Sequence, residues 1–139
     1  MILVDTNVVS EPMKTRGDPR VVDWLDRQVT ETLFISTITI SEILFGVAAL
    51  PAGRRRSRLG DACEQEIGRL FEGRILSFDL AAARAYARLM SLARRRGLSL
   101  PLADGRIAAV AAANGLAVAT RDEAPFRAAG LKTVNPWTE

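Results

Sequence analysis

Short apolar runs alternate along the chain with longer segments whose apolar residues recur every three or four positions. The runs have the length of buried strands, and the longer segments have the spacing of helices that bury one face. The predicted strands span residues 1–5, 32–36, 75–78, 116–119 and 132–134. The predicted helices span residues 6–12, 19–29, 38–50, 54–72, 80–96, 101–114 and 123–129.

This alternation of strands and helices predicts the α/β class. Right-handed β-α-β connections would place about five strands in a mainly parallel sheet, with helices on both faces in a three-layer α/β/α arrangement. Residues 1–139 are long enough for one domain with a sizeable core. In such sheets, ligands bind beyond the carboxyl ends of the strands.

Several predicted helix boundaries coincide with capping residues. Asp18 and Asp79 fit N-caps, Pro19 fits the first helical position, and Gly97 and Gly115 fit the positions just past helix ends. The side chains expected to face the core are Val21, Val22, Trp24 and Leu25, then Ile40, Ile43, Leu44 and Val47, then Tyr86, Leu89, Met90 and Ala93.

Composition excludes several kinds of chemistry. The chain has no histidine, so Ser-His-Asp and Cys-His catalysis and histidine-bearing zinc sites are excluded. Cys63 is the only cysteine, which excludes an internal disulfide and a cysteine zinc cluster, and we expect it to be an inert packing residue. No signal peptide and no membrane-length apolar run are evident, so we expect a soluble, cytoplasmic protein with no membrane partner.

The formal net charge is +3 and the sequence pI is about 9.7. Of 19 basic residues only Lys14 and Lys132 are lysines; the others are arginines. Guanidinium groups bind phosphates and carboxylates as a bidentate fork, which favours a nucleic acid or an acidic protein as partner. Compositional bias with solvated surface arginines explains the same numbers, so charge alone leaves both interpretations open.

Four acidic residues occupy positions that would meet at one edge of the predicted sheet. Asp5 and Asp122 follow strands, whereas Glu42 and Asp104 lie in the first turns of helices. Such a cluster is costly unless a cation neutralises it, and oxygen ligands suit Mg²⁺ or Mn²⁺. The hypothesis is a metal-dependent site that cleaves phosphodiester bonds.

Each acid also has a purely structural explanation. Asp5 and Asp122 could cap the turn or helix that follows them, and Asp104 could complement the positive end of its helix. Glu42 could complete a capping box with Thr39.

Helical spacing adds weight to the functional interpretation. Asp104 shares a face with Ile107, Ala108 and Ala111, which should point inward, so this carboxylate would end a buried stripe. By the same spacing, Glu42 aligns with a face that we expect to pack closely because it holds small residues; its members are Phe45, Gly46 and Ala49.

Polar residues beside the acids are candidates for orienting carboxylates or water. They are Thr6, Asn7, Ser41 and Thr120. Turn and helix-entry chemistry demands the same residue types, so both roles stay open.

At this point the motifs resemble a known family. MILVDTNVVSEP, ISTITISEILFGV, PLADGRIAAVAA and LAVATRDEAPFRAAGLKTVNPW are similar to segments of PIN-domain proteins, most of all VapC-type toxins of the FitB-like branch of bacterial toxin–antitoxin systems. The resemblance extends over essentially the whole chain.

The resemblance implies a sheet of about five parallel strands and a Mg²⁺- or Mn²⁺-dependent endoribonuclease. It assigns the acidic quartet to Asp5, Glu42, Asp104 and Asp122, with Thr6 as the polar residue after the first acid. Many relatives have Asn in place of Asp122, and an Asp where this chain has Pro125. Because of that departure, Glu123 becomes a further candidate ligand.

The resemblance also implies partners. These are an RNA substrate, a second copy of the chain in a homodimer, and a cognate antitoxin whose basic residue reaches the carboxylates. Operator DNA would be bound only through the antitoxin. Candidate contacts to RNA or antitoxin are Arg54, Arg55, Arg94, Arg95 and Arg121, although solvated helix ends explain the two clusters equally well. Trp24 and Trp137 could stack on bases, but we expect both to pack in the core.

Two other functions are compatible with parts of the sequence. A non-catalytic PIN-fold co-repressor would share the fold and the antitoxin. A haloacid-dehalogenase-like phosphatase would use Asp5 as a covalent nucleophile, but such enzymes normally have a second Asp where this chain has Asn7.

Overall fold

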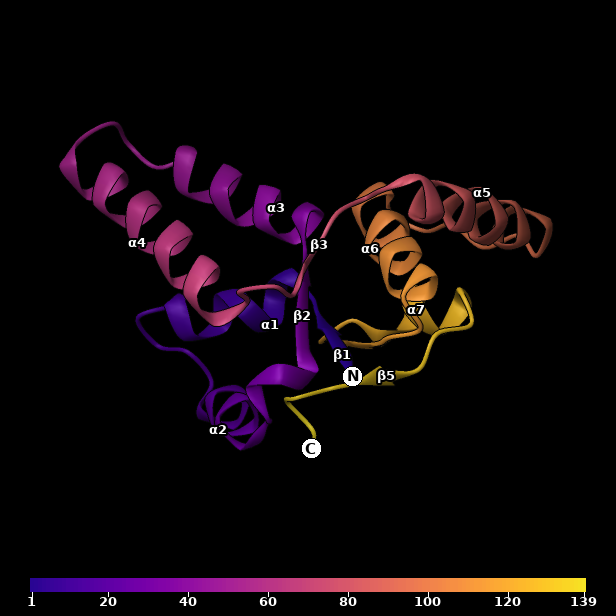
Figure 1. Cartoon of the computed structure of the whole chain (residues 1–139), viewed down its shortest axis with the longest axis horizontal. Coiled ribbons are helices and arrows are strands. Elements are labelled where there is room, and N and C mark those ends of the chain that lie inside the picture. The colour runs from indigo at the N-terminus through magenta and orange to yellow at the C-terminus, as the bar shows by residue number, and fades with distance from the viewer.

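The computed structural model describes all residues, 1–139, and brings the five predicted strands into one parallel sheet (Figure 1). The strand order is β3-β2-β1-β4-β5. The strands are β1 (Ile2–Val4), β2 (Leu33–Ser36), β3 (Ile75–Leu76), β4 (Ala117–Ala119) and β5 (Thr133–Val134). All four pairings are parallel, as predicted.

The helices fall where the hydrophobic spacing predicts them, to within a few residues. They are α1 (Thr6–Ser10), α2 (Pro19–Arg27), α3 (Thr37–Ala48), α4 (Arg54–Leu70), α5 (Leu80–Arg95), α6 (Leu102–Ala113) and α7 (Glu123–Ala128). Two short 3-10 turns, η1 (Glu11–Met13) and η2 (Thr30–Thr32), join α1 to α2 and α2 to β2. Pro12 ends the α-helical hydrogen bonding but lies within η1.

Each face of the sheet has its own core, because successive strand residues point to opposite faces. Leu3 and Val118 belong to a cluster with residues of α5, α6 and α7, whereas Val4 and Ala119 belong to a cluster with residues of α1 to α4. Figure 1 shows these two helix groups on either side of the strands. The sequence therefore produces the expected three layers.

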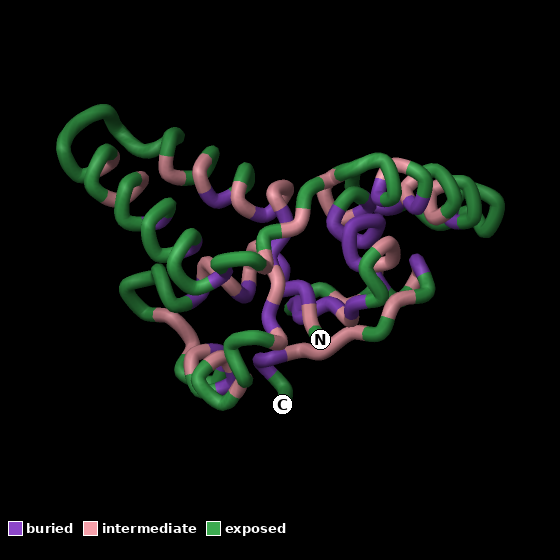
Figure 2. The backbone as a smooth tube through the Cα atoms, viewed as in Figure 1, coloured by how far each residue is buried: buried purple, intermediate pink, exposed green.

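Helix α6 is the most deeply buried helix (Figure 2). It packs closely on α5 at Gly105, where a Cβ atom would lie 3.0 Å from Met90 Sδ and 3.3 Å from the Tyr86 ring. The missing side chain lets the first turn of α6 approach α5. This contact fixes the helix that presents Asp104.

The predicted caps are confirmed. Asp18 Oδ1 accepts a hydrogen bond from Arg20 N at 2.9 Å, and Asp79 Oδ1 accepts one from Ala82 N at 2.9 Å. Gly97 has φ +68°, the left-handed conformation that ends a helix at low cost when the residue is glycine.

The predicted core faces need three corrections. In α2, Val21 and Trp24 are buried, but Val22 and Leu25 are only half-buried because they border an open cavity. In α3 only Ile43 is fully buried among the four expected positions. In α5 the predicted Ala93 is buried together with Ala82 and Ala85, whereas the larger side chains predicted there, Tyr86, Leu89 and Met90, are half-buried.

The order of the strands identifies a particular edge of the sheet. From β1 the chain continues through β2 to β3 on one side, and then returns to β4 and β5 on the other side of β1. The carboxyl ends of β1 and β4 therefore lie side by side where the direction of winding reverses. Open parallel sheets bind ligands at this point. None of the helices combines the length and the apolar character that crossing a bilayer requires.

Candidate functional site

Asp5 lies directly after β1, at the point where the winding reverses, and it is 5% exposed. Its backbone N–H donates to Ala119 O at 2.9 Å, which continues the pairing with β4. Its carboxylate accepts the Thr6 N–H at 2.7 Å and the Thr120 hydroxyl at 2.8 Å. The capping role considered for Asp5 is confirmed. The same carboxylate, which follows β1, is also bound by Thr120, which follows β4.

Thr120 connects Asp5 to the loop after β4. Its hydroxyl is fully buried, donates to Asp5 Oδ2 and accepts the Asp122 N–H at 3.2 Å. Asp122 makes no side-chain cap to α7, so the capping role considered for it is not found. Thr120 thus orients one acid and positions the backbone of the other.

Glu42 lies on α3 and points toward α1, where its Oε1 accepts the Thr6 hydroxyl at 2.7 Å. The proposed capping box with Thr39 is wrong, because α3 begins at Thr37 and Ser36 caps it by accepting the Thr39 N–H at 3.1 Å. Glu42 is therefore free to serve the site.

The packing predicted for the Glu42 face is also wrong. Phe45, Gly46 and Ala49 are exposed, and Phe45 exposes 76% of its surface. Helix α3 buries an adjacent face, with Thr39 and Ile43, and Ile43 packs with Val4 and Ile35 of the sheet. The Glu42 carboxylate is therefore held by its hydrogen bond to Thr6 rather than by close packing.

Asp104 lies in the first turn of α6 and is half-buried at the end of an inward stripe. The three residues predicted to share that stripe, Ile107, Ala108 and Ala111, are fully buried, as expected. Burial, as the largest cause, and the charges of Asp5, Asp122 and Glu42, in that order of size, together raise the pKa of Asp104 to about 6.

The electrostatics place the four acids near one another. Burial is also the main cause that raises the pKa of Asp5; hydrogen bonds from Thr120 and Thr6 oppose it, and Glu42 and Asp122 add repulsion. None of the four carboxylates forms an ion pair with a basic residue of the chain. The fold thus concentrates negative charge at the switch point, the edge of the sheet where the carboxyl ends of β1 and β4 meet. No basic side chain neutralises this charge.

This donor set fits a hard divalent cation in its chemistry. All ligands would be carboxylate oxygens, and no basic side chain of the chain forms an ion pair with them. As the side chains are placed, no three of them lie close enough together to enclose an ion. Mg²⁺ typically keeps several waters and is bound through one or two carboxylates, so a complete carboxylate cage is not required.

One carboxylate oxygen of Glu123 is engaged within the scaffold. Its Oε1 accepts hydrogen bonds from Arg127 at 2.8 Å and from the Thr133 hydroxyl at 2.7 Å, which tie α7 to β5. Glu123 therefore has a structural role, and the ligand role considered for it stays a prediction.

The remaining polar candidates divide between the site and the scaffold. Asn7 Oδ1 accepts the Arg121 N–H at 3.3 Å, so this side chain orients the loop after β4. Ser41 donates to Ile38 O at 2.6 Å within its own helix and has no hydrogen bond to the acids. The orienting role predicted for Ser41 is not found.

The site has one feature that sequence reasoning missed. The guanidinium carbon of Arg121 lies 5.3 Å from the centre of the Trp137 ring. Trp24 and Trp137 are buried in the core, as predicted, with 4% and 5% exposed. The signal for this contact in the sequence was the Asn-Pro-Trp segment near the C-terminus. Its Trp137 contacts Arg121, and its Asn135 Nδ2 donates to Arg121 O at 3.4 Å.

The two arginine clusters lie far apart. Arg54 and Arg55 begin α4 at the tip of the α3–α4 hairpin, and Arg94 and Arg95 end α5 at the opposite side of the molecule (Figure 1). Arg95 donates to Ser91 within its helix at 3.2 Å. Their contact to RNA or antitoxin stays a prediction.

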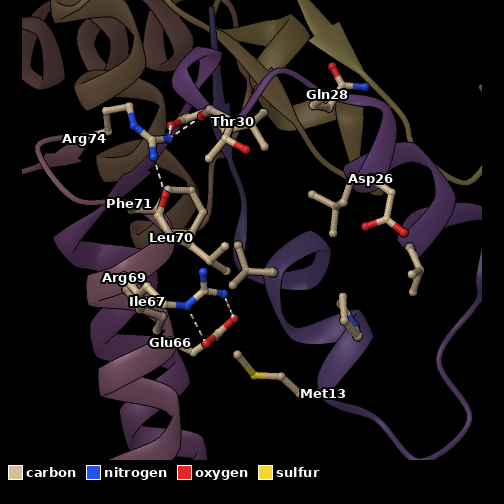
Figure 3. Close-up of a pocket in the computed structure, with 15 residues that line it drawn as sticks. Met13, Asp26, Gln28, Thr30, Glu66, Ile67, Arg69, Leu70, Phe71 and Arg74 are labelled. Atoms are coloured by element: carbon tan, nitrogen blue, oxygen red, sulfur yellow. Dashed lines mark hydrogen bonds and ion pairs between the residues drawn. The ribbon is translucent and has the colours of Figure 1, made fainter.

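A cavity lies away from the acidic cluster. It has a volume of about 600 Å³ and lies between η1, α2 and the end of α4 (Figure 3). Its wall includes the Arg69–Glu66 ion pair and Arg74, whose guanidinium donates to backbone carbonyls of Thr30, Leu33 and Leu70. A smaller cavity of about 270 Å³ does border the site through Thr6 and Glu42.

Comparison with known proteins identifies relatives along the full chain. A family profile described as PIN domain matches residues 2–131. The VapC ribonuclease Y4jK of Sinorhizobium fredii is 50% identical over 137 residues, which cover 99% of this chain and 98% of that protein. Toxin FitB of Neisseria gonorrhoeae is 46% identical over 137 residues, which cover 99% of each chain.

Solved structures agree with these sequence matches. The crystal structure of FitAcB from Neisseria gonorrhoeae matches 100% of both chains with a TM-score of 0.95 and 45% identity. The structure of FitAB bound to an IR36 DNA fragment matches 99% of this chain and 96% of that chain, with a TM-score of 0.93 and 45% identity.

Proposed function

The chain belongs to the PIN-domain family, and we propose that it is the ribonuclease toxin of a toxin–antitoxin pair. Its relatives named VapC ribonuclease and toxin FitB support this, as do neighbouring structures that are toxin–antitoxin complexes. The observation on which the proposal rests is the uncompensated group of Asp5, Glu42, Asp104 and Asp122 at the switch point.

We assign metal binding to these four carboxylates. A bound Mg²⁺ or Mn²⁺ would supply an activated water and stabilise the charge that develops on the phosphorus centre and the leaving oxygen. Asp5 is the most firmly oriented ligand, because its carboxylate accepts hydrogen bonds from Thr6 and Thr120. Thr6 also holds Glu42, so a single threonine links two ligands.

The chain's own residues would handle protons in a defined way. Asp104, with a pKa of about 6, is the acid that exchanges a proton most readily near neutral pH when no ion is bound. Entry of a cation would displace that proton, because ligands bind in their charged form. No histidine is available to share this role.

We further propose three partners: RNA as substrate, an antitoxin as inhibitor, and a second copy of the chain. The acidic site attracts a basic residue, so an antitoxin can compete with the metal there. The DNA-bound FitAB structure supports operator binding through the antitoxin in a complex of this kind.

The proposal is tested by expressing the wild-type chain and Asp5→Asn without antitoxin. Wild type should arrest growth and Asp5→Asn should not, because asparagine keeps the N-cap but removes the charged ligand. Sequencing of RNA 5′ ends shortly after induction would identify the cleavage sites. Asp79→Asn is the matched control: it makes the same change at the N-cap of α5, away from the site, and should stay toxic.

Two results would contradict the proposal. If wild type and Asp5→Asn arrest growth equally and generate no new RNA ends, the chain acts as a non-catalytic co-repressor. If a phosphate becomes covalently attached to Asp5, the phosphatase alternative is correct. The hydrogen bonds to both carboxylate oxygens of Asp5 and the PIN-domain match favour neither outcome.

A further inference from the structure

Arg121 is an exposed cation with no counter-ion at the edge of an acidic site. It directly follows Thr120 and precedes Asp122. Its guanidinium forms no ion pair and donates no hydrogen bond within the chain. Its N–H donors therefore face solvent, and the one acid whose pKa its charge affects is Asp18.

The backbone of Arg121 is held from two sides. Asn7 Oδ1 accepts its N–H at 3.3 Å, and Asn135 Nδ2 donates to its carbonyl oxygen at 3.4 Å. Asn7 belongs to α1 and Asn135 follows β5, so segments far apart in sequence fix this loop. The residue is thus positioned before any ligand arrives.

The side chain is positioned as well. Its guanidinium carbon lies 5.3 Å from the centre of the Trp137 ring, within the range of a cation–π interaction. Trp137 is itself fixed, since it is 5% exposed, packs in the α1–α4 core and donates its N–H to Asn135 Oδ1 at 3.0 Å. The ring contacts the guanidinium without using any of the N–H donors along its edge, none of which has a partner within the chain.

A nearby carboxylate does not use that edge. Asp18 is bound by Arg20, whose Nε and Nη2 both donate to it. These hydrogen bonds hold the pKa of Asp18 at about 2, and the Arg121 charge adds only a minor contribution. Arg121 therefore remains available to an external anion.

We infer that Arg121, held by Trp137, is a phosphate-binding position for a single-stranded RNA, taking the non-bridging oxygens of a phosphate next to the one that is cleaved. The inference rests on the proposed nuclease function. A planar guanidinium edge matches a phosphate in a bidentate geometry, and the ring restricts its orientation. The adjoining acids repel RNA, so an oriented cation offsets that repulsion on the side of α1.

An acidic segment of a protein partner would suit the same edge less well. Such a segment would meet the repulsion of four carboxylates without bringing a cation. A basic antitoxin residue would bind at the carboxylates, as proposed above, and not at the guanidinium edge of Arg121. RNA brings both the phosphates and the divalent ions that accompany them.

The test measures binding of a fluorescein-labelled 12-nucleotide single-stranded RNA of mixed sequence at several KCl concentrations, in an Asp104→Asn background without divalent ions. Arg121→Met keeps an unbranched side chain over Trp137 but removes the charge. Its Kd should rise roughly tenfold. The slope of log K against log salt, which is negative, should become shallower by about 0.7, the amount expected for the loss of one phosphate contact on a single strand. Arg121→Lys should keep the wild-type slope with a Kd between the two, because it retains a charge without the fork.

Arg69→Met is the charge-matched control, because Arg69 is already paired with Glu66 and lies in the wall of the other cavity. It should change neither Kd nor slope. Melting temperatures show that the variants are folded. In a protein that keeps Asp104, and with metal present, Arg121→Met should raise KM more than it lowers kcat.

The inference is overturned if Arg121→Met binds the RNA like its parent, or if Arg69→Met weakens binding equally. It is also overturned if Arg121→Met leaves RNA binding unchanged but weakens binding of the antitoxin. Since binding is measured without cleavage, these results are separate from a failure of the nuclease proposal, which would appear as an inactive wild type.

Discussion

At Asp104, burial and charge repulsion act in the same direction. The ordinary pKa of an aspartate is 3.8, and here it is raised to about 6. A carboxyl with a raised folded-state pKa contributes its full stability below the unfolded-state value and loses it as pH rises through the folded value. The metal-free protein should therefore become less stable between about pH 4 and pH 6.

Asp104→Asn should stabilise the metal-free protein at pH 7.5, because it removes a charge that has no compensating partner. A gain of about 1 kcal/mol would raise Tm by roughly 3–5 °C, measured by calorimetry in EDTA. At pH 4.5, where Asp104 is largely protonated, the two proteins should melt at similar temperatures. A variant that melts below wild type at pH 7.5 would show that Asp104 is a structural residue.

Protonation of Asp104 should also make metal binding depend on pH. A cation needs the charged carboxylate, so affinity for Mn²⁺ should fall by about tenfold per pH unit below pH 6. The raised pKa of Asp5 should steepen that fall. Titration calorimetry with Mn²⁺ from pH 5 to pH 8 would measure it, and an affinity independent of pH would exclude Asp104 as a ligand.

The position of a site residue could be predicted from the sequence where the hydrophobic pattern of its own strand or helix determines it. Asp5 and Asp122 follow apolar runs, and Asp104 ends an inward stripe, so sequence placed all three at one edge. Thr120 was only a candidate, because its hydrogen bond to Asp5 spans 115 positions and depends on the pairing of β1 with β4. The Arg121–Trp137 contact depends on the same kind of long-range packing.

At the scale of elements, the site depends on where helices begin. Helix α6 can start close to α5 because Gly105 has no side chain. The boundaries of α2, α5 and α6 were predictable because Asp, Pro and Gly mark them. The face of α3 was not, because its apolar residues surround the helix and give no single direction.

Gly105→Ala should disturb the site although it raises helix propensity. The added Cβ would meet Met90 Sδ at 3.0 Å, so the first turn of α6 or the Met90 side chain must shift. We expect a loss of about 1–2 kcal/mol in the free energy of unfolding and weaker Mn²⁺ binding. Urea denaturation and calorimetry would measure both.

Gly68→Ala in α4 is the matched control, since its Cβ would meet no atom within 4 Å. It should stabilise the protein by up to about 1 kcal/mol and leave Mn²⁺ binding unchanged. Equal effects of the two alanines would show that the α5–α6 contact does not position Asp104.

At the scale of the whole molecule, two cores account for the burial of both sheet faces, but several large apolar residues stay exposed, Phe45 most of all. Phe45 exposes 76% of its surface on α3, beside exposed Gly46 and Ala49. Large exposed aromatic residues are typical of protein interfaces. Sequence predicted a homodimer from resemblance alone and could not predict which surface forms it.

Phe45→Glu should convert the predicted homodimer to a monomer, because two copies of the charge would meet across a twofold interface. Loss of an aromatic anchor costs roughly 2 kcal/mol or more, a rise in the dimer Kd of about thirtyfold. Light scattering during size-exclusion chromatography would measure it. Val29→Glu, at another exposed apolar residue, should stay dimeric, and a dimeric Phe45→Glu would place the interface elsewhere.

The central claim is that distant acids converge on a divalent cation, and anomalous diffraction from crystals soaked in Mn²⁺ at pH 7.5 tests it most directly. The account predicts an anomalous peak at the carboxyl ends of β1 and β4, with oxygen ligands from Asp5 and at least one of Glu42, Asp104 and Asp122. A fully active protein whose Mn²⁺ peaks all lie away from these carboxylates would contradict it.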